Sequence, residues 1–418
     1  MLNKIKNKSY NLLRQSEKYT KTDMIYLTKG GLWLSLGQII AFISALLLTI
    51  TFANLLPKET YGTYKYLISI LALLSIPSLK KFGTAFIQSI ARGYEGNFEE
   101  ILWTKIKWGS LGSLASFILA FYYFIQNNYT LAISFCIIAI IVPFFNGFNF
   151  YISYLSGKKI FSKLTKYRSL SQISVTISVV ISLFLTNNVL FILLTYLSSE
   201  TITRLIALYL TKKKFPPNKE KDEGVIEYGK HLSFIELFKS IAEEADKILI
   251  YHYIGGAELA IYSIAISPIG QIKTFILNLK TLAFPKLSKA KTEVIKKTLL
   301  KKILKASLIT IPIIVIYILL APWLFSIFFP KYVDSAFLSQ ILAISIILVP
   351  SSLMSSALSA KKQIKSLYRL RILGSLGKLI IYFIAIKFYG LIGLVISRII
   401  IDIYTTLLYK YYFNKISN

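Results

Sequence analysis

The chain has 418 residues, of which 55% are hydrophobic, and its mean hydropathy is +0.60. Soluble domains rarely have so apolar a composition, so nearly the whole chain is predicted to lie in a bilayer. A net charge of +30 would favour nucleic-acid binding in a soluble protein, but basic cytoplasmic loops explain it better in a membrane protein, and no nucleic-acid partner is expected.

The N-terminal residues 1–29 form a basic segment that is predicted to lie in the cytoplasm. An amphipathic helix on anionic lipid and a frayed tail are both consistent with it. We expect no cleavable signal peptide, because the first apolar run is too long and no small-residue cleavage site follows it.

Apolar runs of the length needed to cross a membrane recur along the rest of the chain. A span needs roughly 20 mostly apolar residues, and about twelve such runs are present. The chain is therefore predicted to be an all-α polytopic membrane protein. The predicted spans are 30–54, 63–90, 106–125, 130–155, 169–186, 188–210, 231–254, 259–284, 303–328, 335–359, 369–387 and 390–412.

The distribution of basic residues between the loops predicts the orientation. With these spans, most Lys and Arg fall in the segments on the side of the N-terminus, and the other side holds only Lys58, Lys65, Lys331 and Lys387. Basic loops stay in the cytoplasm, so both termini, including the tail 413–418, are expected there.

A charged linker at 211–230 divides the spans into two halves of six. We interpret these halves as an N-lobe (30–210) and a C-lobe (231–412). Leu56–Ser69 and Ile254–Ser267 follow the first span of each half, and both contain a short turn and then a tyrosine that opens the next span. This correspondence predicts a parallel two-fold repeat, which is common in transporters.

The motifs of enzymes are missing. The loops between the predicted spans are too short to hold a soluble catalytic domain, and "GSLGKL" (Gly374–Leu379) lacks the spacing of an ATP-binding loop. His231 and His252 are the two histidines and Cys136 is the single cysteine, which excludes an internal disulfide and a Cys/His metal cluster. We therefore expect neither catalysis nor a metal or other cofactor.

The seventh predicted span carries ionisable residues along one face. Glu236, Lys239, Glu243 and the pair Asp246/Lys247 lie on one stripe at helical spacing, and Glu243 is four residues from both lysines. The opposite face is apolar. The stripe is predicted to form one wall of a wet central cavity, and the alternative is a ladder of salt bridges between helices.

Other ionisable residues also fall within predicted spans, where a charge is costly and normally faces the interior of the bundle. Glu200 with Arg204, and Arg398 with Asp402, have the i, i+4 spacing of local ion pairs. Further bases have no acid nearby in sequence. They are Lys80, Lys81, Lys273, Lys280 and Lys378.

These bases predict the charge of the ligand. A cavity with surplus positive charge suits an anionic substrate such as a diphosphate. For Lys80 and Lys378 the alternative is that the side chain reaches the lipid headgroups.

Two stretches resemble a known family. Thr28–Ile70 is similar to its first helix, Leu-Pro turn, Glu-x-Tyr-Gly-x-Tyr pattern and second helix, and Ala245–Ala290 is similar to its Asp-Lys/Arg, Gly and Tyr pattern ending in Phe-Pro-Lys-Leu. The family is the polysaccharide exporter branch of the multidrug, oligosaccharidyl-lipid and polysaccharide (MOP) exporter superfamily, which includes O-antigen and capsule flippases. The resemblance covers most of the chain.

The resemblance implies a flippase with two six-helix lobes in a V shape, working by alternating access in the bacterial inner membrane. It would move an undecaprenyl-diphosphate-linked oligosaccharide between leaflets, as a monomer that serves the polysaccharide polymerase machinery. Coupling to H⁺ or Na⁺ would involve Glu236, Glu243 or Asp246. The expected substrate-binding residues are Lys80, Lys81, Arg204, Lys239, Lys247, Lys273, Lys280, Lys378 and Arg398.

Some features bear on the cargo and on rival functions. The pair Lys80-Lys81 is similar to a basic pair in lipid II flippases, but the first span has Gln38 as its notable polar group and lacks the bases of those relatives, which argues against lipid II. A multidrug exporter would share the fold, but its N-terminal half usually carries more acidic residues than Glu200 alone. A polysaccharide polymerase or glycosyltransferase, which typically needs a large outer loop, and a purely structural membrane protein remain as further alternatives.

Overall fold

The computed structural model describes residues 24–289, 292–361 and 363–415. Within these ranges every regular element is a helix, which confirms the predicted all-α class. The first group of helices comprises α2 (Met24–Leu55), α3 (Lys58–Leu74), η1 (Ile76–Ser78), α4 (Phe82–Ala91), α5 (Phe98–Ile125), α6 (Tyr129–Gly147), η2 (Phe148–Phe150), α7 (Tyr151–Gly157), α8 (Phe161–Leu185) and α9 (Val189–Lys214).

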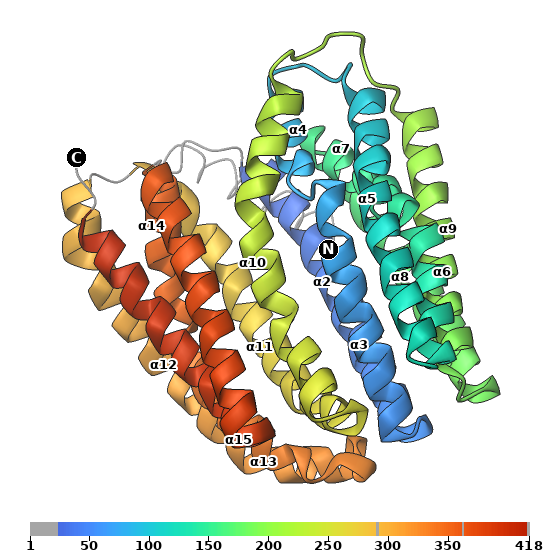
Figure 1. Ribbon diagram of the computed structural model, residues 1–418. Coiled ribbons are helices and arrows are strands. Elements are labelled where there is room, and N and C mark those ends of the chain that lie inside the picture. The colour runs from blue at the N-terminus through green and yellow to red at the C-terminus, as the bar shows by residue number, and fades with distance from the viewer. Residues whose placement is uncertain (1–23, 290–291, 362, 416–418) are drawn as a thin grey trace, which may run out of the picture.

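The second group follows the linker. It comprises α10 (Val225–Tyr253), α11 (Gly256–Lys289), α12 (Thr292–Phe328), η3 (Pro330–Tyr332), α13 (Ser335–Ile344), η4 (Ser345–Ser351), α14 (Ser352–Ala360) and α15 (Ile364–Asn414). Figure 1 shows the two groups side by side, with α10 between them. We call α2–α9 the N-lobe and α10–α15 the C-lobe.

Many of these helices can cross a membrane. Nine helices in the described part of the chain are long and apolar enough, or ten if the bent pair Lys58–Leu74 and Ile76–Ala91 is one span. The charged helix α10 is not among them, and α15 counts once although Gly390 is non-helical and joins two helices there. The chain is thus a multi-pass membrane protein, and the number twelve stays a prediction.

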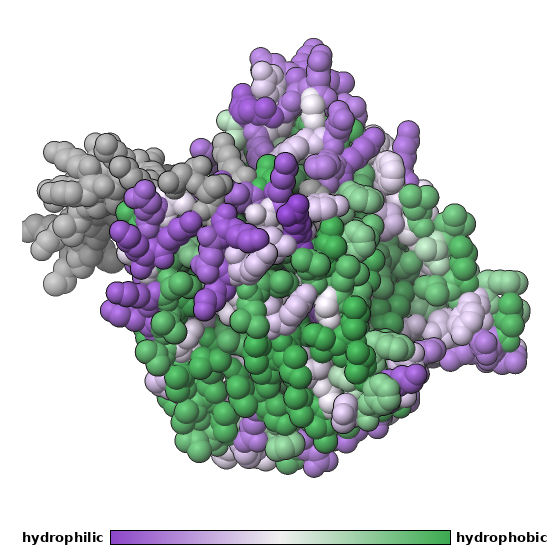
Figure 2. Space-filling model, turned by 60° about the vertical axis from the view of Figure 1, so that its left-hand side comes forward, coloured by the Kyte–Doolittle hydropathy of each residue, from purple (hydrophilic) through white to green (hydrophobic). Residues whose placement is uncertain are grey.

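The surface has the pattern of a membrane protein. Figure 2 shows a broad hydrophobic band, with hydrophilic residues gathered mainly at one end of the molecule. Many large apolar side chains of the described residues are exposed, among them Phe121, Phe184 and Leu319. In water such a surface would be unfavourable, whereas lipid chains solvate it.

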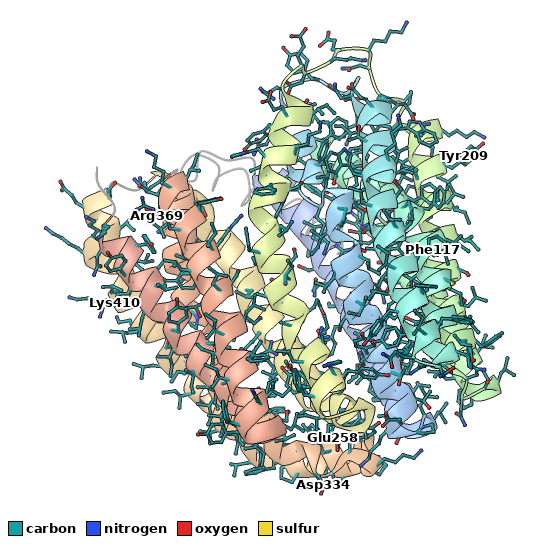
Figure 3. All side chains as sticks on the ribbon, in the orientation of Figure 1. Phe117, Tyr209, Glu258, Asp334, Arg369 and Lys410 are labelled. Atoms are coloured by element: carbon teal, nitrogen blue, oxygen red, sulfur yellow. The ribbon has the colours of Figure 1, made fainter. Side chains whose placement is uncertain are left out.

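We name the two ends of the molecule by what they carry. The linker end holds the connection between α9 and α10, and the turn end holds the short turns between α2 and α3 and between α10 and α11 (Figure 1). In Figure 3, Arg369 lies near the linker end of the C-lobe and Glu258 lies at the turn end, where the lobes meet.

The buried apolar side chains show how the lobes are joined. One large cluster contains residues from both lobes, for example Leu67 of α3 and Leu259 of α11. One further cluster, represented by Phe86, holds N-lobe residues together with Val225 at the start of α10, and another, represented by Leu358, holds C-lobe residues. The lobes therefore share a large core toward the turn end, whereas toward the linker end each has its own cluster and the start of α10 joins that of the N-lobe.

Candidate functional site

The lobes meet closely at the turn end, where α3 packs against the start of α11. A Cβ atom on Gly62 would lie 1.7 Å from the carbonyl oxygen of Gly256, so the two backbones touch. The Glu59 carboxylate accepts hydrogen bonds from the N–H groups of Gly256 (3.2 Å) and Ala257 (2.8 Å). These N–H groups have no partner within α11, so a residue of one lobe caps a helix of the other.

Aromatic side chains extend this contact between the lobes. The rings of Tyr66 in α3 and Tyr251 in α10 stack with centroids 4.0 Å apart and an interplanar angle of 9°. The hydroxyl oxygens of Thr63 and Tyr251 are 3.3 Å apart. The hydroxyl groups of Tyr66 and Tyr123, both in the N-lobe, form a hydrogen bond of 2.7 Å. The turn end is therefore closed by specific polar and aromatic contacts.

The N-lobe presents its basic pair at a break between α3 and α4. The two helices differ in direction by 42°, and Leu79 between them has a φ of 56° in the left-handed region. Lys105 of α5 is buried and donates a hydrogen bond of 2.9 Å to the carbonyl of Ser78, which the break leaves without a helical partner. This arrangement fixes where the following residues, Lys80 and Lys81, lie.

Lys81 reaches across to the C-lobe. Its Nζ lies 3.6 Å from the Glu236 carboxylate, which also contacts Lys239 at 3.0 Å and Arg371 of α15 at 2.8 Å. We call these four residues the Glu236 cluster. The exposed Lys80 lies beside it, and its electrostatic neighbours include Glu243 and Glu244 of α10.

A second charged group lies inside the C-lobe. Asp246 is 1% exposed and accepts hydrogen bonds from Tyr262 (2.6 Å) and from Arg398 (2.7 Å). Lys273 of α11 pairs with Asp402 of α15 at 2.9 Å. We call these five residues the Asp246 cluster.

The structure tests the predicted local ion pairs. Glu200 with Arg204 is confirmed, as is Lys239 with Glu243 at 3.3 Å. The other two pairs with this spacing do not form, because each base lies closer to a different acid. Arg398 pairs with Asp246 and not with Asp402, and Lys247 pairs with Glu244 and not with Glu243.

The remaining predicted site residues are spread through the molecule. Arg204 is held inside the N-lobe, with its guanidinium 4.0 Å from the Phe145 ring and a hydrogen bond to the Phe145 carbonyl. The Lys378 Nζ lies 5.3 Å from the ring centroid of Tyr382, and Asp246 is among its charged neighbours. The side chain of Lys280 lies outside the described residues.

Three basic residues near the charged clusters are not among the residues predicted for the site. The sequence predicts Arg371 and Lys105 in or beside cytoplasmic loops, and it predicts Lys65 in an outer loop. Lys65 instead lies within α3, and Glu244 and Lys247 of α10 are its charged neighbours. Its position inside the predicted second span was the available signal.

An apolar pocket of about 490 Å³ lies between α3, α10 and α15. Leu73 contributes to it from the N-lobe, and Ala245 and Leu379 each adjoin a charged residue of the C-lobe. An amphipathic ligand could therefore place a charged group and an apolar chain close together at this interface. The lining residues are Leu73, Ile241, Ala245, Ile248, Leu249, Leu379, Ile380, Phe383 and Ile384.

Comparisons with known proteins identify the family and the fold. A family model described as "Polysaccharide biosynthesis protein" matches residues 27–291. A comparison with curated protein sequences gives no match.

Solved structures with similar folds are flippases and transporters. One is titled "Lipid II flippase MurJ, inward closed conformation", with a TM-score of 0.70 and 17% identity over 91% of this chain and 87% of that chain. An inward-facing MATE family multidrug resistance transporter has a TM-score of 0.59 and 14% identity over 92% and 97%. A MOP superfamily transporter from Pyrococcus furiosus has a TM-score of 0.53 and 16% identity over 92% and 96%. These likenesses confirm the predicted MOP flippase fold.

Proposed function

The chain belongs to the polysaccharide biosynthesis protein family, and on that premise we propose that it is a flippase for an undecaprenyl-diphosphate-linked oligosaccharide. It would carry the repeat unit of an O-antigen, capsule or similar polymer from the inner to the outer leaflet of the bacterial inner membrane. We assign it no catalytic role.

The observation that carries this proposal is the Glu236 cluster. Basic side chains from both lobes converge there, and three cations surround one carboxylate. Guanidinium and ammonium groups bind phosphate oxygens strongly, so a diphosphate suits this position. The neighbouring apolar pocket can take the first units of the prenyl chain while the rest stays in lipid.

The proposed transport cycle uses the two ends of the molecule in turn. With the termini in the cytoplasm, the linker end faces inward and the turn end faces outward. Cargo enters at the linker end, away from the large shared core, and the contacts of Glu59 and Gly62 with α11 keep the outer side closed meanwhile. Release requires these contacts to break as the lobes rotate.

Among the three carboxylates considered for H⁺ or Na⁺ coupling, Glu243 has the greatest freedom. Its side chain is 54% exposed and contacts Lys239, whereas the Glu236 and Asp246 carboxylates are buried in ion pairs. We propose Glu243 as the first candidate for coupling. We also propose that the protein acts as a monomer that supplies the polymerase machinery.

A multidrug exporter is the second candidate, because MATE family transporters share the fold. Such a protein would need unpaired acids for a cationic drug. In the C-lobe the buried Asp246 is neutralised by Arg398, which favours the anionic cargo.

Deleting the gene and extracting the undecaprenyl-linked pool tests the proposal. We expect a lipid-linked oligosaccharide to accumulate and the surface polysaccharide to be lost, both restored by the wild-type gene. A normal pool with a normal surface polymer would contradict the proposal, and export of cationic drugs would then be measured.

Replacing Lys81 tests the role of the basic interface. Lys81→Ala should fail to restore the surface polysaccharide, because the N-lobe then loses its cation at the Glu236 cluster. Lys331→Ala, at the turn end in η3, is the matched control and should restore it fully. Full activity of Lys81→Ala would remove the cationic interface from the mechanism.

A further inference from the structure

The Glu236 cluster has the form of an anion site that already contains an anion. The side chain of Glu236 is 10% exposed, whereas Lys81, Lys239 and Arg371 are 35%, 48% and 35% exposed. The carboxylate thus sits behind its three cations, which keep a side open to solvent. With one negative and three positive charges, the cluster retains a net positive charge.

We propose that Glu236 occupies the place of a phosphate group, and that the diphosphate of the cargo displaces it from Lys81, Lys239 and Arg371. The proposal rests on the proposed function, and it adds the residue that holds the three cations together. Carboxylate and phosphate oxygens make the same charge-assisted hydrogen bonds to Lys and Arg, so one can replace the other. Without Glu236, the three cations would repel one another across the interface.

Displacement makes the site selective for highly charged head groups. Breaking the contacts of Glu236 has the same free-energy cost for every ligand, so a ligand binds only if its own attraction to the cations exceeds that cost. A diphosphate brings more charge and more oxygen atoms than a monophosphate. Glu236 therefore discriminates against lipids linked through a single phosphate.

The groups that face Glu236 from each packed helix support this role. Lys81 comes from the start of α4, Lys239 from α10 itself and Arg371 from α15, so the diphosphate would join the same two lobes that Glu236 joins. Lys80 adds a further positive charge beside the cluster. Glu243 also contacts Lys239 at 3.3 Å and is an electrostatic neighbour of Lys80, but its side chain is 54% exposed, whereas that of Glu236 is enclosed.

Binding of farnesyl diphosphate and farnesyl monophosphate to the full-length protein in lipid nanodiscs tests the proposal. Glu236→Gln should bind farnesyl diphosphate about tenfold more tightly than the wild type does, because no carboxylate has to be displaced. It should also bind the monophosphate at concentrations where the wild type does not. Glu293→Gln, exposed at the start of α12, is the control and should change both affinities by less than about threefold.

Equal or weaker binding of farnesyl diphosphate by a folded Glu236→Gln protein would overturn the proposal. If that variant does not fold, Arg371→Ala replaces it and should weaken diphosphate binding by about tenfold, because one cation is lost. Unchanged binding by Arg371→Ala would also overturn the proposal.

The outcomes separate this proposal from the proposed function. Accumulation of lipid-linked oligosaccharide in the deletion strain, together with unchanged affinities in Glu236→Gln, would leave the flippase and remove the displacement. A normal lipid-linked pool, together with tighter binding by Glu236→Gln, would leave the diphosphate site and remove the flippase.

Discussion

At the scale of single residues, the buried charges of the C-lobe form pairs that leave little free charge. Asp246 is fully enclosed, and its side chain accepts hydrogen bonds from Tyr262 and Arg398 on two other helices and from the backbone N–H of Lys247. A buried carboxylate is tolerated because these partners compensate for its lost hydration. Removing Arg398 alone leaves the Asp246 carboxylate buried without its ionic partner.

Replacing Arg398 should therefore destabilise the C-lobe. Arg398→Ala is expected to lower the free energy of unfolding by about 3–5 kcal/mol, because the buried Asp246 keeps its charge without its ionic partner. Thermal unfolding in detergent measures the loss. The double variant Asp246→Ala/Arg398→Ala should recover much of it, and equal melting temperatures for the single and double variants would contradict this account.

Lys105 is a second residue whose replacement should lower the stability of the protein directly. Lys105→Met keeps the shape of the side chain and loses the hydrogen bond to the Ser78 carbonyl, so we expect a loss of about 1–3 kcal/mol in stability. Transport should fall as well, because Lys80 and Lys81 follow the break that Lys105 stabilises. Lys107→Met, exposed on the same helix, is the control and should leave both the melting temperature and transport unchanged.

The residues of the site could be predicted only in part from sequence. The charged span and Lys81 stand out because a charge in an apolar run is costly and so has a partner or a role. The pairing of Arg398 with Asp246 and the arrival of Arg371 at Glu236 could not be predicted, because both join helices far apart in the chain. Spacing within one helix says nothing about such partners.

At the scale of the elements, the contact between α3 and α11 depends on two glycines. Gly62 and Gly256 allow the backbones to touch, and Glu59 then reaches the N–H groups at the start of α11. Any side chain at position 62 would push the helices apart. The turn end is thus closed because the backbones of α3 and α11 approach each other closely at Gly62 and Gly256.

Gly62→Val should open the turn end. Spin labels placed on α3 and α11 at this end should show a longer mean distance than in the wild type, because the added side chain would overlap the Gly256 carbonyl. Gly270→Val is the control, since a Cβ at this α11 position meets no atom within 4 Å. An unchanged distance in Gly62→Val would show that the contact does not hold the lobes closed.

Helix positions were largely predictable, and the breaks within them were not. The apolar runs locate the helices because a span must satisfy its own backbone hydrogen bonds. The predicted span 63–90 is in fact α3 and α4 with η1 between them, since Leu79 is left-handed and Lys105 supports the break. Gly390 marks a boundary that was predicted, because the apolar pattern restarts there.

At the scale of the whole molecule, the distribution of buried clusters indicates which end opens more easily. The large shared core lies toward the turn end, whereas toward the linker end each lobe has its own cluster and only the start of α10 is seen to join that of the N-lobe in the described residues. Rotation of one lobe against the other disturbs a shared core more than separate ones. The described state is therefore one in which the turn end is held closed.

A covalent bridge at the turn end should stop transport. With Cys136 replaced by Ser, the pair Glu59→Cys/Ala257→Cys can be joined by a short thiol crosslinker where the native side chain contacts the backbone. We expect loss of transport with the pair and not with either single cysteine. A reducible crosslinker should allow recovery, and transport by the bridged protein would exclude opening at this end.

The linker has one further consequence, for how motion passes between the lobes. It is fastened to the turn between α4 and α5, where Asn218 donates to the Gly93 carbonyl (2.7 Å) and Asp222 donates its N–H to Asn97 (2.8 Å). A linker attached in this way cannot lengthen when the lobes move apart. Any swing of the C-lobe must then be absorbed within α10, so the flexibility of that one helix sets how far the lobes can separate.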